Sequence, residues 1–170
     1  SGFMSITGPG SPMKAGPGIG DLIPGLMCAF GVVAAVRHAE RTGAGQLVDV
    51  GMYDAMLSMC ERIVHQHAVA GVIPQAEGND HPLVNPFSIY QARDGWMAIG
   101  CPVESHWQAL ARLIGREDLL ADPTLQSNPD RVRQRDRVRE AIEAWTRPRT
   151  KREITAVLGG HVPSGPVQDV

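Results

Sequence analysis

The chain has 170 residues, of which 43% are hydrophobic and 20% charged, and its formal net charge is −2. This length and composition predict one soluble domain or two small ones with enough apolar material for a core. Because the charges are interspersed and nearly balanced, they give no electrostatic reason to expect a nucleic-acid or membrane partner. The three cysteines, none in a CxxC pattern, leave at least one unpaired and favour a reducing, cytoplasmic compartment.

The first segment, residues 1–20, is rich in glycine and proline, which predicts a loop that leads into a helix. Asp21 is expected to cap that helix, and an apolar run follows from Leu22 to Val36. The run is apolar on nearly every face, which predicts a buried helix that ends at the glycines of "RTGAGQ". It is expected to be too short to cross a membrane.

The next segments predict a short strand at 46–52 and a second helix at 53–71. Helix, strand and helix in this order suggest part of an α/β layer. His65 and His67 lie two positions apart in the second helix and therefore face different directions, so no metal site is predicted there.

A different pattern follows a polar linker. Two apolar-rich runs within 87–101 flank Asp94-Gly95 and predict a β-hairpin with its tight turn at that dipeptide. Three helices are expected afterwards, at 104–114, 129–145 and 151–158.

Helix-start signals precede the last two of these helices. Asn128 comes before Pro129 in the second, and Thr150 with Glu153 forms a capping box in the third. The alternating arginines at 131–139 are interspersed with acids and lack stacking aromatics, so a solvated helix face is favoured over an RNA-binding surface.

Asp21 has two interpretations from the residues alone. It is a suitable helix cap, since Asp is among the preferred capping residues. The same place beside backbone N–H groups and small glycines keeps a carboxylate ionised and accessible, as a nucleophile toward an activated acyl group requires.

Five segments in order resemble the middle of a family III CoA-transferase, the group that includes formyl-CoA and carnitine CoA-transferases. The segments are "SGFMSITG", "GIGDLIPG", "AAVRHAERTGAGQLVDVGMYDAML", "GNDHPLVNPFSIYQARDGWMAIG" and "HVPSGPVQDV". The resemblance implies that Asp21 attacks an acyl-CoA thioester, forming an aspartyl anhydride and then an aspartyl-CoA thioester. It implies no metal and no permanently bound cofactor, with the CoA thioester as substrate.

The resemblance also places a mobile flap at Gly78 and Asn79, over the aspartate. Here Asp80, His81 and a proline follow instead of further glycines, so the loop is expected to be stiffer than in formyl-CoA transferases. His81 is open to two interpretations: a substrate contact, or a loop histidine satisfied by the backbone.

Two alternatives to a transferase remain. The first is a 2-methylacyl-CoA racemase, a relative that moves a proton and carries an acid soon after the hairpin; here Val103 holds that position, with Glu104 next to it. The second is a non-catalytic structural relative in which Asp21 serves only as a cap.

The resemblance implies an α/β architecture in two parts. Residues 1–74 are expected to be part of a Rossmann-like large domain, and residues 75–170 a smaller α+β domain. It further implies an interlocked homodimer, with most of the CoA pocket in sequence before Ser1. The 170-residue piece is therefore expected to be an internal fragment and inactive alone.

Overall fold

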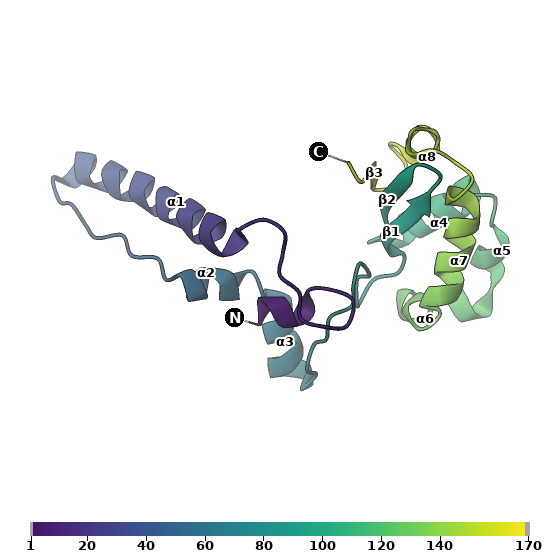
Figure 1. Cartoon of the computed structure of the whole chain (residues 1–170), viewed down its shortest axis with the longest axis horizontal. Helices are drawn as coiled ribbons and strands as arrows, with labels where there is room; N and C mark the ends of the chain where they lie inside the picture. The colour runs from purple at the N-terminus through teal and green to yellow at the C-terminus, as the bar shows by residue number, and fades with distance from the viewer. Residues whose placement is uncertain (1, 169–170) are drawn as a thin grey trace. The chain divides into compact units, whose positions relative to one another are not determined.

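The computed structural model describes residues 2–168 (Figure 1). The chain divides into two compact units, Ser1–Gly78 and Asn79–Val170, called unit 1 and unit 2 below. The architecture is mixed, with helices in both units and a small antiparallel sheet in unit 2. The assignment of the first part to a Rossmann-like domain stays a prediction.

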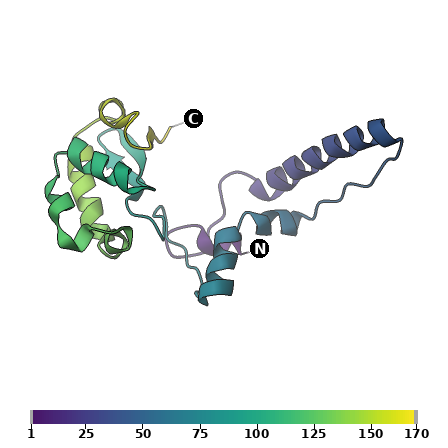
Figure 2. The same ribbon diagram turned by 180° about the vertical axis from the view of Figure 1, so that it is seen from behind.

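The described residues of unit 1 form a short 3-10 turn and three helices joined by loops (Figures 1 and 2). The elements are η1 (Phe3–Ile6), α1 (Ile19–Thr42), α2 (Met52–Ser58) and α3 (Glu61–Ala70). The helix α2 packs beside α1.

The start of α1 differs from the prediction. The helix begins at Ile19, and its N-cap is Gly18, which offers no side-chain cap. Asp21 is therefore the third helical residue, in the first turn, and the capping interpretation is wrong. The predicted end is confirmed, because Gly43 closes the helix with φ 75°, a left-handed conformation that glycine adopts without strain.

The predicted burial of α1 is also wrong. Only Pro24 and Ala35 are buried, whereas Phe30 is 82% exposed and Val33 71% exposed. The helix extends beyond the apolar run at both ends and reaches 24 residues, so it is long and apolar enough, by those criteria alone, to cross a membrane. The expectation that it is too short therefore fails.

The strand predicted at 46–52 does not form. Residues 45–51 are without regular structure, and Met52 already starts α2. A strand needs a neighbour to satisfy its backbone groups, and no strand among the described residues of unit 1 offers one. The single helix expected at 53–71 is broken between α2 and α3, where the Cys60 N–H donates to Leu57 O in a tighter turn.

Unit 2 contains the sheet, whose strand order is β1-β2-β3 with both pairings antiparallel. The strands are β1 (Phe87–Ala92), β2 (Gly95–Gly100) and β3 (Ser164–Pro166). The hairpin is confirmed, but its turn lies one residue earlier than predicted: Ala92 pairs with Gly95, so Arg93 and Asp94 form the turn.

The helices of unit 2 pack on one apolar core. They are α4 (Glu104–Leu113), α5 (Asp118–Ala121), η2 (Pro123–Leu125), α6 (Asn128–Arg133), α7 (Arg135–Thr146) and α8 (Lys151–Leu158). The predicted helices at 104–114 and 151–158 are confirmed, as is the Thr150 and Glu153 capping box. Side chains from the sheet and the helices meet in the core, among them Met97, Leu110, Val138, Ile142 and Ile154.

The helix expected at 129–145 is interrupted at Gln134, which separates α6 from α7. Its N-cap is Ser127 rather than Asn128, because Ser127 and Asp130 form the capping box. The side chain of Asn128 instead bonds the linker, accepting from the Asn85 N–H at 3.0 Å.

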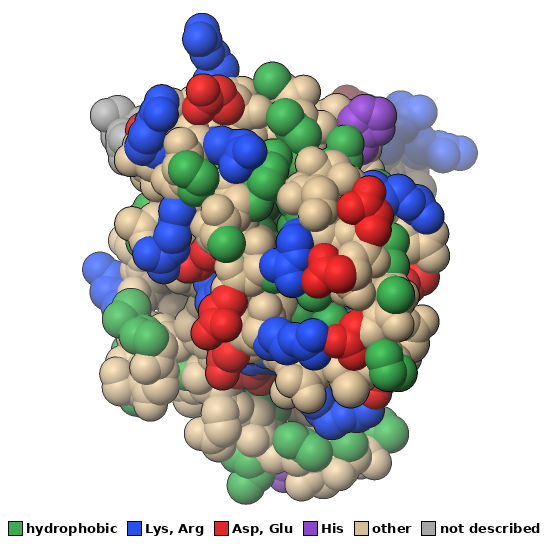
Figure 3. All heavy atoms as spheres, turned by 90° about the vertical axis from the view of Figure 1, so that its right-hand side faces the viewer, with side chains coloured by type: hydrophobic (Ala, Val, Ile, Leu, Met, Phe, Trp, Pro, Cys, Tyr) green, Lys and Arg blue, Asp and Glu red, His purple; other side chains and the backbone are tan. Residues whose placement is uncertain are grey.

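The arginine series is only partly a solvated face. Arg133 and Arg137 are exposed, but Arg131 is 1% exposed and contradicts the prediction. Its guanidinium donates to Asn85 O and Leu125 O, each at 3.1 Å, so burial leaves its donors satisfied. Elsewhere on unit 2, Lys and Arg lie among Asp and Glu (Figure 3).

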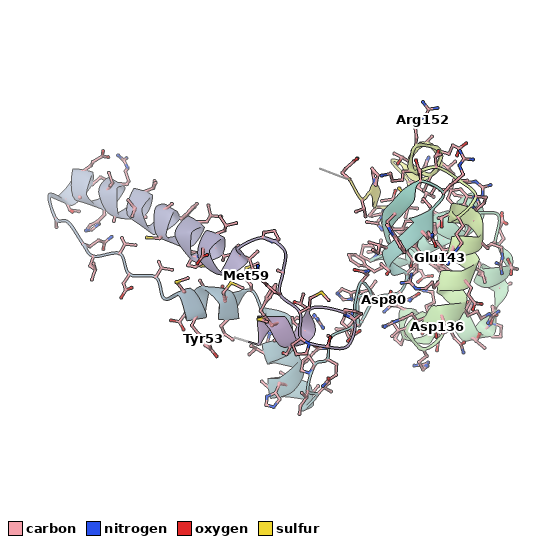
Figure 4. The ribbon with its side chains drawn as sticks, viewed as in Figure 1. Tyr53, Met59, Asp80, Asp136, Glu143 and Arg152 are labelled. Atoms are coloured by element: carbon pink, nitrogen blue, oxygen red, sulfur yellow. The ribbon has the colours of Figure 1, made fainter. Side chains whose placement is uncertain are left out.

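Two arginines of α7 hold the first residues of unit 2. Arg135 lies 4.0 Å from the Asp80 carboxylate and donates to His81 O at 3.4 Å. Arg139 pairs with Asp80, donates to Ser88 Oγ at 2.6 Å, and bonds Glu143 at 3.2 Å on its own helix. Figure 4 labels Asp80 and Glu143 in this region. The segment after Asn79 is therefore held against α7 by side-chain contacts.

Candidate active site

Asp21 lies in the first turn of α1 with its side chain exposed. Its N–H donates to Gly18 O at 3.0 Å, and a side chain at Gly18 would come within 3.6 Å of Asp21 Oδ2. The glycine thus leaves one side of the carboxylate open. The positive end of the helix dipole favours the negative charge at this position.

Gly20 contributes a second feature of this turn. Its N–H has no acceptor among the described residues, whereas those of Ile19, Asp21 and Leu22 all donate to carbonyls of the preceding loop. An unbonded N–H at a helix start is a suitable donor to an anion.

A pocket of about 380 Å³ adjoins the residues immediately before Asp21. Its lining comes from η1, from the loop after it, from Gly18–Gly20 and from α2. Phe3, Met4 and Met56 supply apolar walls. The pocket is therefore a concave, mainly apolar site next to a carboxylate.

Lys14 also lines this pocket and was missed by the sequence analysis. It is the only charged side chain among the described residues of the lining, and it is exposed. One sequence signal was present: Lys14 is the first cationic side chain of the chain, and the next is Arg37.

Gly78 and Asn79 lie at the end of unit 1 and the start of unit 2. The Gly78 N–H donates to Gly8 O at 2.9 Å, and its φ of 65° requires the freedom of glycine. Asn79 is exposed. Their predicted role as a flap over Asp21 stays a prediction.

His81, in unit 2, is held by the backbone. Its Nδ1 accepts from the Leu83 N–H at 3.1 Å, its own N–H donates to Phe87 O at 3.0 Å, and its ring packs edge-on against Phe87. These contacts support the interpretation of a loop histidine satisfied by the backbone. A substrate contact stays a prediction.

Glu104 bears on the racemase alternative. Its carboxylate accepts a 2.8 Å hydrogen bond from Arg131, which also stacks over Trp107 at 5.1 Å. Val103, at the position where racemases carry an acid, serves as the N-cap of α4. The nearest acid is thus engaged in a structural ion pair, which weighs against that alternative.

The described residues give little support for a metal site or a cysteine nucleophile. The described residues contain no group of three or more His, Cys, Asp or Glu side chains suited to a metal ion. Burial raises the pKa of the Cys60 thiol, and it raises the pKa of Cys101 to about 12. Both thiols are therefore protonated near neutral pH and unsuited to nucleophilic attack.

Comparison with known proteins agrees with the resemblance. Residues 1–170 match the family model described as CoA-transferase family III. The chain is 42% identical over 171 residues to a succinyl-CoA:mesaconate CoA-transferase of Haloarcula hispanica, covering 99% of this chain and 42% of the relative. It is 32% identical over 174 residues to an acetyl-CoA:oxalate CoA-transferase of Acetobacter aceti, covering 100% of this chain and 45% of the relative.

A further relative and a solved structure show the same relation. A succinate–glutarate CoA-transferase of Agrobacterium fabrum is 31% identical, with 100% of this chain and 43% of the relative covered. The crystal structure of a CAIB/BAIF family protein from Brucella suis superposes with a TM-score of 0.78 at 27% identity, covering 99% of this chain and 45% of that one. The chain spans less than half the length of each of these proteins.

Proposed function

Because the chain belongs to CoA-transferase family III, we propose that it carries the nucleophile of an enzyme that transfers CoA from an acyl-CoA donor to a carboxylic acid. The observation that carries this proposal is the position of Asp21, exposed in the first turn of α1 next to a largely apolar pocket. A thioester is uncharged and fits such a pocket, whereas the attacking group must be an accessible anion.

In the first half of the proposed reaction, an Asp21 carboxylate oxygen attacks the thioester carbonyl. The C–S bond breaks, CoA leaves as a thiolate, and an aspartyl anhydride forms. The thiolate then attacks the aspartyl carbonyl of that anhydride, so the donor acid leaves as a carboxylate and aspartyl-CoA remains.

The second half runs the same steps in reverse with a new acid. The acceptor carboxylate attacks aspartyl-CoA and expels the CoA thiolate, which then attacks the acceptor carbonyl of the new anhydride. The products are the new acyl-CoA and the free Asp21 carboxylate. No water, proton or redox partner is consumed, so this chemistry requires no metal or permanently bound cofactor.

Backbone donors support the tetrahedral intermediates of this scheme. Gly20 precedes Asp21, lines the pocket, and has an N–H without an acceptor among the described residues. A preorganised N–H beside a developing oxyanion stabilises the transition state more than the ground state.

The relatives' names suggest the class of acid. Succinate, mesaconate, glutarate and oxalate are all dicarboxylic acids. We extend this class to the present protein as part of the proposal.

Several properties of the whole protein belong to the same proposal. They are the interlocked homodimer, a flap formed by Gly78 and Asn79 with His81 near the substrate, cytoplasmic location, and inactivity of these 170 residues alone. The exposed apolar surface of α1 and the greater length of the relatives support the need for further protein around unit 1.

The test is covalent trapping in the full-length protein. Incubation with acyl-CoA followed by hydroxylamine or borohydride should modify Asp21, as located by peptide mass spectrometry. The substitution Asp21→Asn should lower CoA exchange by about 10³-fold or more, because an amide is a far weaker nucleophile than a carboxylate.

The matched control is Asp54→Asn. Asp54 lies in the first turn of α2, is exposed, and follows a glycine three residues earlier, as Asp21 does in α1. Exchange should be retained in this control. Full exchange in Asp21→Asn with an unchanged melting temperature would disprove the assignment, and absence of any exchange in the unaltered protein would favour the non-catalytic relative.

A further inference from the structure

The pocket beside Asp21 holds one charge that the anhydride chemistry does not use. Lys14 contributes to the lining, and its side chain forms no hydrogen bond or ion pair with another described residue. The rest of the lining is uncharged and mainly apolar, from residues such as Phe3 and Met56, and the Ser5 hydroxyl in it donates to Gly2 O at 2.7 Å. A lone cation in such surroundings attracts an anion more strongly than it does in bulk water.

We propose that Lys14 binds the second carboxylate of a dicarboxylic acid while the first carboxylate reacts at Asp21, so that Lys14 determines selectivity for dicarboxylic acids. This inference rests on the proposed function. It assigns a residue to substrate selection, whereas Asp21 alone explains exchange with any carboxylic acid.

The short distance between the two ends of a small diacid favours this ligand over CoA itself. Lys14 and Gly18–Gly20 line the same pocket of about 380 Å³, and Asp21 follows directly. The second carboxylate of a four- or five-carbon diacid is only a few bonds from the reacting one. The phosphates of CoA lie at the far end of the pantetheine arm from the sulfur, and the described lining offers no second cation for them.

The side-chain type and its loop also suit this role. Lysine presents a compact charge on a flexible stem, so it can follow the terminal carboxylates of acids that differ in length. The segment from Lys14 to Asp21 contains Gly16, Gly18 and Gly20, so only Pro17 and Ile19 among the intervening residues carry a side chain larger than a methyl group.

The experiment measures the kinetics of CoA transfer from acetyl-CoA to succinate in the full-length protein. Only the acceptor then carries a second carboxylate. The variants are Lys14→Met, which keeps the length without the charge, and Lys14→Arg, which keeps the charge. Arg37→Met is the control, because Arg37 is an exposed cation of α1 outside the pocket lining.

Lys14→Met should raise the KM for succinate about tenfold or more and leave the KM for acetyl-CoA within about twofold, because one charge-assisted hydrogen bond to the acid is lost. Lys14→Arg should restore most of the affinity for succinate, and Arg37→Met should behave like the unaltered protein. An unchanged KM for succinate in Lys14→Met would overturn the inference. A rise confined to the KM for acetyl-CoA would also overturn it and assign Lys14 to CoA binding.

The two proposals fail in different ways. If Asp21 is trapped and exchange proceeds but Lys14→Met keeps its KM for succinate, only the inference about Lys14 fails. If the unaltered protein neither exchanges CoA nor labels Asp21, the proposed function fails and takes this inference with it. Because Lys14 is exposed, we expect unchanged melting temperatures; should Lys14→Met unfold, Lys14→Gln provides the same comparison.

Discussion

The two units of the chain differ in how completely each buries its own apolar side chains. In unit 2, Leu110, Ile142 and Leu158 are fully buried in one core. In unit 1, Leu26 is 69% exposed and Phe30 82% exposed. The unit that carries the candidate nucleophile is thus the one that leaves its apolar surface uncovered.

The difference follows from the distribution of apolar residues along the helices. In unit 2, α4, α7 and α8 each have one apolar face, which a single layer of neighbours can cover. In unit 1, the part of α1 from Leu22 to Val36 is apolar on nearly every face, so it requires neighbours on most sides. Unit 1 supplies α2 and a loop, and the relatives are more than twice as long as this chain.

The largest effect is expected when the two units are produced as separate segments. We expect residues 79–170 to fold alone with a cooperative thermal transition, since this segment contains the complete core. We expect residues 1–78 alone to associate and to lack a cooperative transition, because their exposed apolar side chains find cover only in other molecules. Calorimetry and analytical ultracentrifugation provide the two measurements.

The 170-residue chain serves as the control for that dissection. Its single cooperative transition should match that of residues 79–170. A monodisperse, cooperatively folding segment of residues 1–78 would contradict the comparison and show that unit 1 covers α1 by itself.

A smaller effect is expected when one apolar residue of each unit is truncated and the changes in the free energy of unfolding are compared. Leu110→Ala in the 170-residue chain should lower the free energy of unfolding by about 2–5 kcal/mol, because it opens a cavity in a packed core. Val33→Ala, at a position that is 71% exposed on α1, should change it by about 0.5 kcal/mol or less. Chemical denaturation of each variant, followed by a probe in unit 2, measures both changes. Equal losses at the two positions would remove the distinction between the units.

The fold of unit 2 was more predictable than that of unit 1 because its signals are local. The hairpin follows from two apolar runs around a turn, and α8 starts at a capping box that lies within four consecutive residues, Thr150 to Glu153. Arg131 was not predictable, since its partners Asn85 and Glu104 are distant in sequence. In unit 1, the expected strand at 46–52 depends on a neighbour that the described residues do not provide.

The site shows the same division. Asp21 was found because a motif and the family resemblance mark it. Its expected role as the helix cap was wrong, because the N-cap is Gly18, three residues earlier. Lys14 belongs to no motif, and only the folded loop places it in the lining with Gly18–Gly20. Short-range patterns therefore identified the nucleophile, while the groups that surround it required the three-dimensional structure.

The smallest expected effect concerns the stability of unit 2 in acid. Asp122 accepts hydrogen bonds from the Thr124 hydroxyl at 2.6 Å and the Thr124 N–H at 2.8 Å, and it pairs with Arg137. The Thr124 bonds, followed by the Arg137 guanidinium, lower the pKa of Asp122 from its ordinary 3.8 to about 2. The folded state therefore binds this proton less readily than the unfolded state does.

The sign of the effect follows from that depressed pKa. The contribution of the ionised Asp122 to stability is complete at pH values above the pKa of the unfolded state, 3.8. It is lost as the pH falls toward the folded-state pKa of about 2. We expect the urea midpoint of residues 79–170 to fall in this window, and Asp122→Asn to make the fall shallower, because asparagine keeps an acceptor for Thr124 without titrating. The matched control is Asp136→Asn on α7 (Figure 4), since the Asp136 side chain forms no hydrogen bond or ion pair with another described residue. In this control, the urea midpoint should fall with pH as steeply as in the unaltered segment. If the midpoint of Asp122→Asn falls just as steeply, the bonds from Thr124 and Arg137 do not stabilise the ionised carboxylate, and the acid sensitivity of unit 2 arises from its other ion pairs.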